Sequence, residues 1–262
     1  MDKGYNPFSL EGKTVFVTGA SSGIGQAIAL ACSRMGARVV ITGRDTARLQ
    51  ATYDMLERRD EPVSNEELDT DSHIQLVGDL TDEISLRQIV TELPKLDGVA
   101  FCAGTLSSVL TDAVTMAEAK ALFDVNYFST IELAANLRAS KKIKKGASLV
   151  FISSIAADSN AEPGNALYGA TKAAIKSYSR VMASELSRRK IRVNSVSPGI
   201  VRTPLLKKFA ADEEEMLEDE KKYPLGFGTP DDVANAVVYL LSDASAWMTG
   251  SDIKIDGGRT LR

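Results

Sequence analysis

The sequence predicts an α/β protein with a doubly wound parallel sheet covered by helices on both faces. Apolar runs rich in β-branched residues alternate with helical stretches along the whole chain of 262 residues. This alternation favours parallel pairing, because parallel neighbours need crossover connections. A glycine-rich turn follows the first run, and a Ser-Ser pair ends a later one at 153–154. Such residues at the carboxyl ends of parallel strands indicate a ligand site.

The composition fits one soluble domain over residues 1–262. Apolar residues make up 44% of the chain and the net charge is −4. This mildly acidic composition does not indicate binding to nucleic acid or anionic lipid. No apolar run reaches membrane-spanning length and the first residues lack a signal-peptide core, so we expect a cytoplasmic protein. Cys32 and Cys102 stand far apart and His73 is the only histidine, so no metal site is expected.

Each element is expected from its own residue pattern. Strands are expected at 14–18, 38–42, 73–77, 98–104, 148–153, 191–197 and 252–258. Helices are expected at 26–35, about 46–58, from 82 onward, 117–140, from 168 to about 188, and 230–241. Residues 57–71 are expected to form a surface insertion. Residues 205–228 are expected to form a lid over the substrate, although two solvated charged helices would show the same pattern.

A turn with Gly19, Gly23 and Gly25 follows the first strand. Glycines let the backbone turn tightly and approach a ligand, and the helix that follows offers free N–H groups to a pyrophosphate. The turn therefore indicates a dinucleotide site. Its spacing is Gly-x-x-x-Gly-x-Gly rather than Gly-x-Gly-x-x-Gly, and a purely structural turn is the alternative.

The end of the second strand predicts which nicotinamide cofactor binds. An acid at this place accepts hydrogen bonds from a free ribose 2′-hydroxyl, whereas a base suits a 2′-phosphate. Gly43 stands where the acid is expected and Arg44 follows it, so we predict NADP(H) over NAD(H). NAD(H) stays an alternative, since Arg44 could be a solvated loop residue. Asp79 either contacts the adenine or caps the next helix, a role that Thr81 or Asp82 would fill equally well.

Tyr168 and Lys172 indicate a site of proton transfer. Their spacing of four places both on one helix face, one turn apart. A nearby ammonium stabilises a phenolate, so Lys172 is expected to lower the pKa of Tyr168 and make it a general acid or base. Ser154 is placed to donate a hydrogen bond to a substrate oxygen. The pair is also common on ordinary helices, and Asn126, in an apolar stretch, holds either a water or a structural hydrogen bond.

Taken together, these residues resemble the short-chain dehydrogenase/reductases over nearly the whole chain, and among them the 3-oxoacyl-(acyl-carrier-protein) reductases. The matching motifs are Thr18-Gly-Ala-Ser-Ser-Gly-Ile-Gly25, Asp79-Leu80, Asn126, Ile152-Ser-Ser154, Tyr168-Gly-Ala-Thr-Lys172, Asn194, Pro198-Gly199 and Asp256-Gly-Gly258. The resemblance implies a Rossmann fold of about seven strands and a homo-oligomer, tetramer or dimer. It also implies hydride transfer between NADP(H) and a small carbonyl or secondary alcohol substrate.

The resemblance also implies roles for individual residues. Ser154 would hold the carbonyl oxygen, Tyr168 would donate the proton, and Lys172 would bind the nicotinamide ribose. Asn126 would hold a relay water, and Ser153 would only end its strand. The implied cofactor contacts are Gly19, Ser21, Ser22, Gly23, Ile24, Gly25, Arg44, Asp79, Leu80, Cys102, Ala103, Gly104, Tyr168, Lys172, Pro198, Gly199, Ile200, Val201 and Thr203.

Cys102 departs from the family pattern. The family usually has Asn-Ala-Gly where this chain has Cys102-Ala103-Gly104, and the asparagine amide helps to tie neighbouring strands. A thiol is a weaker hydrogen-bonding group, which puts the rigidity of the sheet and the cofactor contact in question. An NAD-dependent alcohol dehydrogenase and a nucleotide-sensing protein without activity are the alternative functions. Residues 105–114 and 155–167 should line the substrate pocket, and 3-oxoacyl thioesters, ketosteroids, sugars and small ketones all stay open as substrates.

Overall fold

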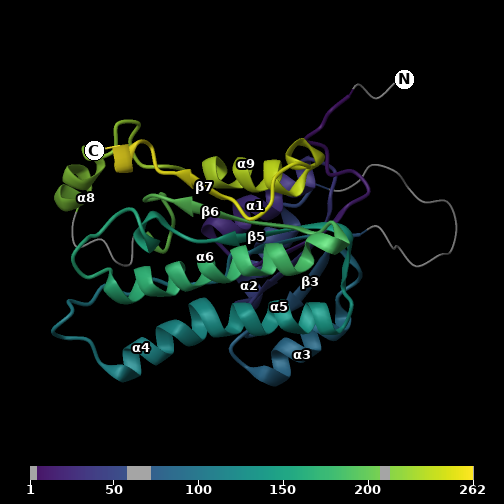
Figure 1. Ribbon diagram of the computed structural model, residues 1–262, viewed down its shortest axis with the longest axis horizontal. Helices are drawn as coiled ribbons and strands as arrows, with labels where there is room; N and C mark the ends of the chain where they lie inside the picture. The colour runs from purple at the N-terminus through teal and green to yellow at the C-terminus, as the bar shows by residue number, and fades with distance from the viewer. Residues whose placement is uncertain (1–4, 58–71, 207–212, 262) are drawn as a thin grey trace, which may run out of the picture.

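Seven parallel strands form one sheet, in the order β3-β2-β1-β4-β5-β6-β7 (Figure 1). The computed structural model describes residues 5–57, 72–206 and 213–261. The strands are β1 (Thr14–Thr18), β2 (Arg38–Gly43), β3 (Ile74–Val77), β4 (Leu96–Phe101), β5 (Ile143–Ile152), β6 (Arg192–Pro198) and β7 (Asp252–Ile255). The predicted doubly wound Rossmann fold is confirmed.

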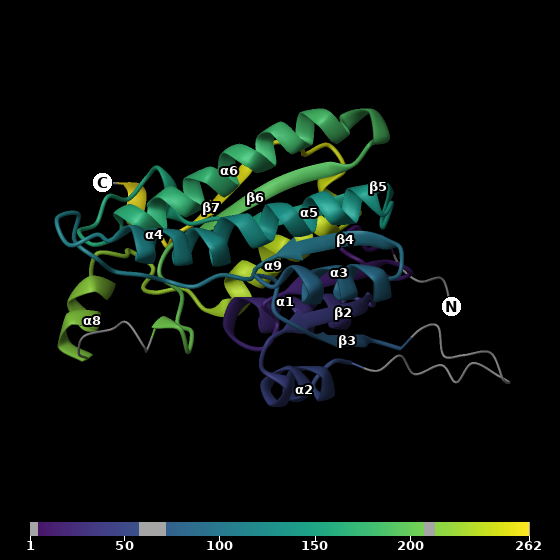
Figure 2. The ribbon, with the colours of Figure 1, turned by 90° about the horizontal axis from the view of Figure 1, so that it is seen from below.

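Helices cover both faces of this sheet. The α-helices are α1 (Gly23–Arg34), α2 (Thr46–Asp54), α3 (Glu83–Glu92), α4 (Met116–Phe123), α5 (Ser129–Ala139), α6 (Ala166–Leu186), α8 (Glu213–Glu220) and α9 (Pro230–Leu241). Helices α1 and α9 pack on one face, and α3, α5 and α6 lie on the other (Figure 2). None of the helices in the described part of the chain is both long and apolar enough to cross a membrane.

Short helical turns complete the described structure. A π-helical turn, η1 (Asp124–Phe128), joins α4 to α5, and 3₁₀ turns are η2 (Ile155–Ala157), η3 (Ser187–Arg189), η4 (Asp243–Ser245) and η5 (Arg259–Leu261). The helix predicted at 117–140 therefore exists, but one turn of it is wider than an α-helix. Such π turns are rare and occur frequently at functional sites.

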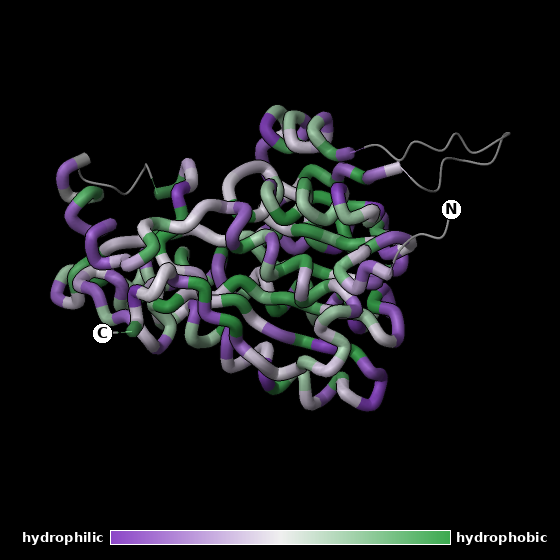
Figure 3. Tube along the Cα trace, turned by 90° about the horizontal axis from the view of Figure 1, so that it is seen from above, coloured by the Kyte–Doolittle hydropathy of each residue, from purple (hydrophilic) through white to green (hydrophobic). Residues whose placement is uncertain are grey.

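The central strands β1, β2 and β4 are mostly buried along their length because helices cover both faces of the sheet. Successive side chains point to opposite faces, so Val15 and Val17 enter the core under α1 and α9, and Phe16 enters the core under α3, α5 and α6. All three are fully buried. Figure 3 shows the resulting hydrophobic centre and the more hydrophilic outer helix surfaces.

Several boundaries differ from the sequence prediction: β7 ends at Ile255 rather than 258 and α2 at Asp54 rather than about 58, and two further differences concern β4 and β5. Strand β4 ends at Phe101, so Cys102 and the two residues after it lie in a loop rather than in the strand. Strand β5 begins at Ile143, inside the basic stretch 141–145, because Ile143 pairs with Leu96 of β4 before a register shift. The predicted insertion at 57–71 and the first part of the lid, 207–212, fall almost wholly outside the described residues.

Replacing Phe151 by alanine should lower the free energy of unfolding by about 3–5 kcal/mol. Phe151 is fully buried in β5, its ring centroid lies 4.3 Å from that of Phe101, and Tyr178 contacts it edge-on. Urea denaturation followed by circular dichroism measures the change. The matched control, Trp247→Ala, removes a fully exposed ring and should change the value by no more than about 0.5 kcal/mol. Equal losses in both variants would contradict this assignment of the core.

Candidate active site

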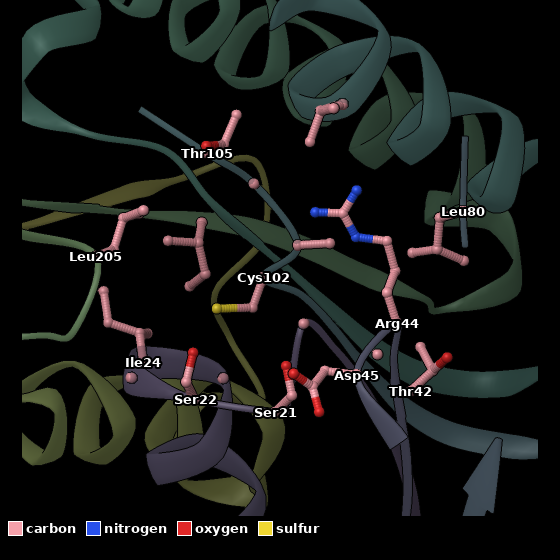
Figure 4. Close-up of a pocket in the computed structure, with 18 of the residues that line it drawn as sticks. Ser21, Ser22, Ile24, Thr42, Arg44, Asp45, Leu80, Cys102, Thr105 and Leu205 are labelled. Carbon is pink, nitrogen blue, oxygen red and sulfur yellow. The ribbon is translucent and has the colours of Figure 1, made fainter. Parts of the chain in front are cut away.

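A cleft of about 330 Å³ opens at the carboxyl ends of β1 and β4, where the strand order reverses (Figure 4). Open α/β sheets bind their ligands at this point. Most of the predicted cofactor contacts line it. These are Gly19, Ser21, Ser22, Gly23, Ile24, Gly25, Arg44, Asp79, Leu80, Cys102, Ala103, Gly104, Tyr168, Lys172 and Thr203.

Close backbone contacts explain the glycines of the first turn. Gly19 has a φ of +66°, and a Cβ there would lie 2.8 Å from the Cα of Ala103. A Cβ on Gly25 would lie 2.3 Å from the carbonyl oxygen of Gly19. Helix α1 begins at Gly23 without a side-chain cap from Ser22, so the N–H groups of its first turn are available to an anion. The turn thus fits a pyrophosphate.

The hydroxyl of Thr18 ties the end of β1 to the end of β4. Its Oγ1 accepts the backbone N–H groups of Cys102 at 2.9 Å and of Ala103 at 3.0 Å. The side chain of Cys102 takes no part in this connection, so the thiol at position 102 does not weaken it. Burial raises the pKa of Cys102 to about 12, and the nearby charge of Lys172 opposes that rise. Cys102 is therefore a protonated thiol at neutral pH.

The adenosine end of the cleft carries Arg44 and Asp79. The Arg44 guanidinium lies 3.5 Å from a carboxylate oxygen of Asp79, and both groups are partly exposed. The other Asp79 oxygen accepts the backbone N–H and the hydroxyl of Thr81 at 2.8 and 2.7 Å. Partial burial acts to raise the pKa of Asp79, but these hydrogen bonds and Arg44 outweigh it and lower the pKa. The cap of α3 is Asp82, which accepts from the N–H of Ser85.

Ser154, Tyr168 and Lys172 meet at the other end of the cleft. The Ser154 side chain lies beside the Tyr168 hydroxyl and favours its ionised form, and the Ser154 hydroxyl accepts the N–H of Ala156 at 3.1 Å. The ammonium of Lys172 donates to the carbonyl of Ile152 at 3.0 Å and lies 5.7 Å from the centre of the Tyr168 ring. Ser153 instead donates to the Lys172 carbonyl at 3.0 Å, within the protein interior. Of the two serines, Ser154 therefore reaches Tyr168.

Burial determines the pKa values of Tyr168 and Lys172. It raises the pKa of Tyr168 to about 12, against a smaller opposing effect of the Ser154 hydrogen bond. It also lowers the pKa of Lys172 to about 8. The prediction that Lys172 lowers the pKa of Tyr168 is wrong for this structure, because the phenol is desolvated and the ammonium is directed to Ile152.

Asn126 lies in the π-helical turn η1, behind the lining of the cleft. Its side chain is buried, and its Oδ1 accepts the N–H of Thr105 at 2.7 Å. Its Nδ2 donates to the carbonyl of Thr105 at 2.9 Å and to the hydroxyl of Thr171 at 3.1 Å. Of the two predicted uses of this amide, the structure shows the structural one, since Asn126 fixes the backbone beside Gly104.

The segment 198–201 lies outside the lining of the cleft, although contacts from Pro198, Gly199, Ile200 and Val201 were predicted. Its backbone bonds elsewhere: Gly199 donates to Ile255, Ile200 donates to the hydroxyl of Tyr223, and Val201 pairs with Gly228. Other lining residues were missed by the sequence prediction, namely Thr42, Asp45, Arg48, Gly78, Thr81, Val125, Ser129, Ile152 and Pro204, whereas Thr105 was expected on the substrate side. Several of them adjoin predicted residues at strand ends, which is the signal that could have found them.

Comparison with known proteins identifies the family. A family model described as enoyl-(acyl carrier protein) reductase matches residues 19–260. A 3-oxoacyl-(acyl-carrier-protein) reductase of Rickettsia felis is 31% identical over 255 residues, covering 96% of this chain and 98% of that protein. A short-chain dehydrogenase/reductase of Pestalotiopsis microspora is 30% identical over 277 residues, covering 96% and 97%. This chain is a short-chain dehydrogenase/reductase.

A solved structure supports the same assignment. A short-chain dehydrogenase/reductase family protein, 33% identical, superposes with a TM-score of 0.82 over 97% of this chain and all of that one. The protein is thus an oxidoreductase of the class that acts on carbonyl and alcohol groups. Members of this family use nicotinamide cofactors, and the glycine turn fits one, because Cβ atoms would close the backbone cradle at Gly19 and Gly25.

Two loops near Ser154 and Tyr168, one after β4 and one before α6, are joined to each other. The N–H of Val109 donates to the carbonyl of Gly164 at 3.0 Å, which joins the loop after β4 to the loop before α6. Glu162 of the second loop pairs with Arg259 of η5. The Arg259 guanidinium also lies 5.9 Å from the ring centre of the buried Tyr223. The loop before α6 is therefore held by the loop after β4 on one side and by η5 on the other.

The stability of the protein should depend on pH through Lys172. Its pKa is about 8 when folded against about 10.5 as a free group, so the charged amine disfavours the folded state by about 3 kcal/mol at neutral pH. Between pH 8 and 10.5 only the unfolded state keeps the proton, and stability rises with pH. The unfolding free energy of the wild type minus that of Lys172→Met should therefore increase by about 3 kcal/mol over this window.

Urea denaturation at steps from pH 7.5 to 10.5 measures this difference. Lys145→Met, at an exposed position, is the control for the loss of a lysine side chain. A difference between wild type and Lys172→Met that stays constant with pH would show that Lys172 is not desolvated in the folded protein.

Proposed function

We propose that this protein is an NADP(H)-dependent oxidoreductase that interconverts a carbonyl and a secondary alcohol, with Tyr168 as general acid and base. One observation carries the proposal: Ser154, Tyr168 and Lys172 lie beside one another at the end of the cofactor cleft. Two hydroxyls arranged in this way define a point where one substrate oxygen can accept from both. A nucleotide-sensing protein would not need this arrangement.

In the reductive direction, Ser154 holds the carbonyl oxygen and Tyr168 gives that oxygen its proton as the alcohol forms. The nicotinamide, when bound, supplies the hydride in this direction and accepts it in the other. The pKa of Tyr168, about 12, keeps its proton in place at neutral pH, so the free protein is ready to reduce. Lys172 is charged below about pH 8 and would bind the nicotinamide ribose, as the resemblance to the family implies. Asn126 supports the site by fixing Thr105.

The preference for NADP(H) is supported by the adenosine end of the cleft. Position 43 has no carboxylate to accept from a ribose 2′-hydroxyl, and a Cβ on Gly43 would lie only 3.2 Å from Ser21. Figure 4 shows the Arg44 side chain extending into the cleft. The nearby Asp45 carboxylate caps α2 and pairs with Arg48 at 2.7 Å, so its charge is compensated. This arrangement suits a 2′-phosphate.

The relative from Rickettsia felis supports a 3-oxoacyl thioester as the substrate, because that protein is a 3-oxoacyl-(acyl-carrier-protein) reductase. A homo-oligomer, tetramer or dimer, is supported by exposed apolar side chains on neighbouring helices. Met116 of α4, Phe128 of η1 and Val181 of α6 are all exposed. Exposed apolar side chains on helices that contact one another are typical of protein interfaces.

Tyr168→Phe should lower kcat at least 100-fold, because it removes the proton donor and leaves the ring. The affinity for NADPH, measured by fluorescence titration, should stay within about twofold of the wild type. The rate is followed by NADPH absorbance with the best substrate of a carbonyl panel that includes acetoacetyl coenzyme A. Tyr178→Phe, ten residues further along α6, is the matched control and should retain activity. Retention of most of kcat in Tyr168→Phe would refute the proposed role.

Arg44→Ala should lower kcat/KM with NADPH about 10- to 100-fold, because hydrogen bonds to a charged group contribute about 1.5–3 kcal/mol. The value with NADH should change little, since NADH lacks the 2′-phosphate. Arg87→Ala on α3, which removes an exposed arginine paired with Glu83, controls for the loss of a surface charge. If the wild type prefers NADH, or if Arg44→Ala retains its kcat/KM with NADPH, the cofactor assignment is wrong.

A further inference from the structure

Lys176 lies one helical turn beyond Lys172 on α6, between two carboxylates. Its Nζ is 2.5 Å from an oxygen of Asp158 and 2.9 Å from an oxygen of Asp252. The Lys176 side chain is 19% exposed and that of Asp252 is 14% exposed, whereas that of Asp158 is half exposed. Ion pairs this sheltered are less screened by salt than surface pairs. Lys176 does not line the cofactor cleft.

Asp252 connects the Lys176 ammonium to the sheet. Its second oxygen accepts the hydroxyls of Ser195 at 2.5 Å and Ser197 at 2.8 Å, both on β6. Asp252 is itself the first residue of β7, which pairs with β6 along its length. The position of the Lys176 ammonium is therefore set by the sheet and by α6, the two rigid elements under the site.

Asp158 connects the same Lys176 ammonium to the turn that carries Ser154. The N–H groups of Ala156 and Ala157 donate to the hydroxyl and the carbonyl of Ser154, both at 3.1 Å. The N–H groups of Ser159 and Asn160 both donate to the carbonyl of Ile155 at 2.9 Å. Residues 154–160 thus form one compact hydrogen-bonded turn. A displacement of Asp158 would therefore displace Ser154 as well, because both belong to this turn.

The turn also packs directly on the helix that carries Tyr168. A Cβ on Gly169 would lie 2.5 Å from the carbonyl oxygen of Ala156, so only glycine allows this approach. The gap between Ser154 and Tyr168 therefore depends on how closely residues 154–160 sit against α6. The contact from Lys176 to Asp158 is an ion pair that draws the far end of this turn onto the same helix.

We infer that Lys176 is a positioning residue, which acts through Asp158 to hold the Ser154 hydroxyl in place beside Tyr168. This inference rests on the proposed function. An ion pair that served only stability would change the unfolding free energy and leave the kinetics alone. A positioning pair changes how well Ser154 holds the substrate oxygen, so it changes the rate and leaves cofactor binding alone.

Lys176→Met should lower kcat/KM for the carbonyl substrate about 10-fold, most of it in kcat, with the affinity for NADPH unchanged. Asp158→Asn should have a similar effect, and the double variant should lose little more than either single one, because both remove the same contact. Lys176→Arg, which keeps the charge, should restore most of the activity. The assay uses NADPH with the best substrate of the carbonyl panel, and thermal denaturation confirms that each variant is folded.

The matched control is Arg138→Met, which breaks the ion pair between Arg138 of α5 and Glu185 of α6. This pair does not contact the turn that carries Ser154. Asp158→Asn alters a half-exposed side chain and keeps the test available if Lys176→Met does not fold. Unchanged kinetics in Lys176→Met and Asp158→Asn, with Tyr168→Phe inactive, would overturn the role of Lys176 and leave the proposed function intact. An active Tyr168→Phe, or a wild type that reduces no carbonyl of the panel, would overturn both.

Discussion

The site depends on how the carboxyl ends of β1 and β4 are joined. A parallel sheet that reverses its strand order leaves a crevice at this point, and its width depends on what connects the two strands. Here one hydroxyl, that of Thr18, accepts two consecutive backbone N–H groups from the loop after β4. The same loop passes within contact of the glycine turn at Gly19 and is fixed on its other side by Asn126. The junction of the two strands is therefore held mainly through backbone groups.

Burial, rather than pairing of charges, sets the protonation of Tyr168, Cys102 and Lys172 at the cleft. Tyr168, Cys102 and Lys172 all shift toward their neutral forms because water is excluded from them. A chemistry that moves one proton benefits from a donor that keeps its proton until a substrate oxygen arrives. Asp79 at the adenosine end of the cleft and Asp158 beside Lys176 differ, because hydrogen bonds and cations lower the pKa of these two carboxylates.

The sequence allowed the fold and much of the cleft to be predicted, because both follow from local patterns. The alternation of strands and helices predicted the sheet, and the glycine spacing predicted the backbone cradle. The choice of Ser154 over Ser153 also agrees with the structure. The acidity of Tyr168 was not predictable, since desolvation depends on residues that are distant in the chain. The same holds for the partners of Asn126 and for Thr18, whose contacts join residues separated by 21 to 85 positions.

The ion pair between Glu162 and Arg259 has a practical consequence. It places the last described turn of the chain, η5, against the loop that we expect to line the substrate pocket, on the side of the molecule away from the amino terminus (Figure 1). A purification tag or fluorescent fusion appended after this turn would begin beside the substrate loop and could distort substrate kinetics. The same addition at the amino end would begin far from the cleft, so it is the better position for assays of this protein.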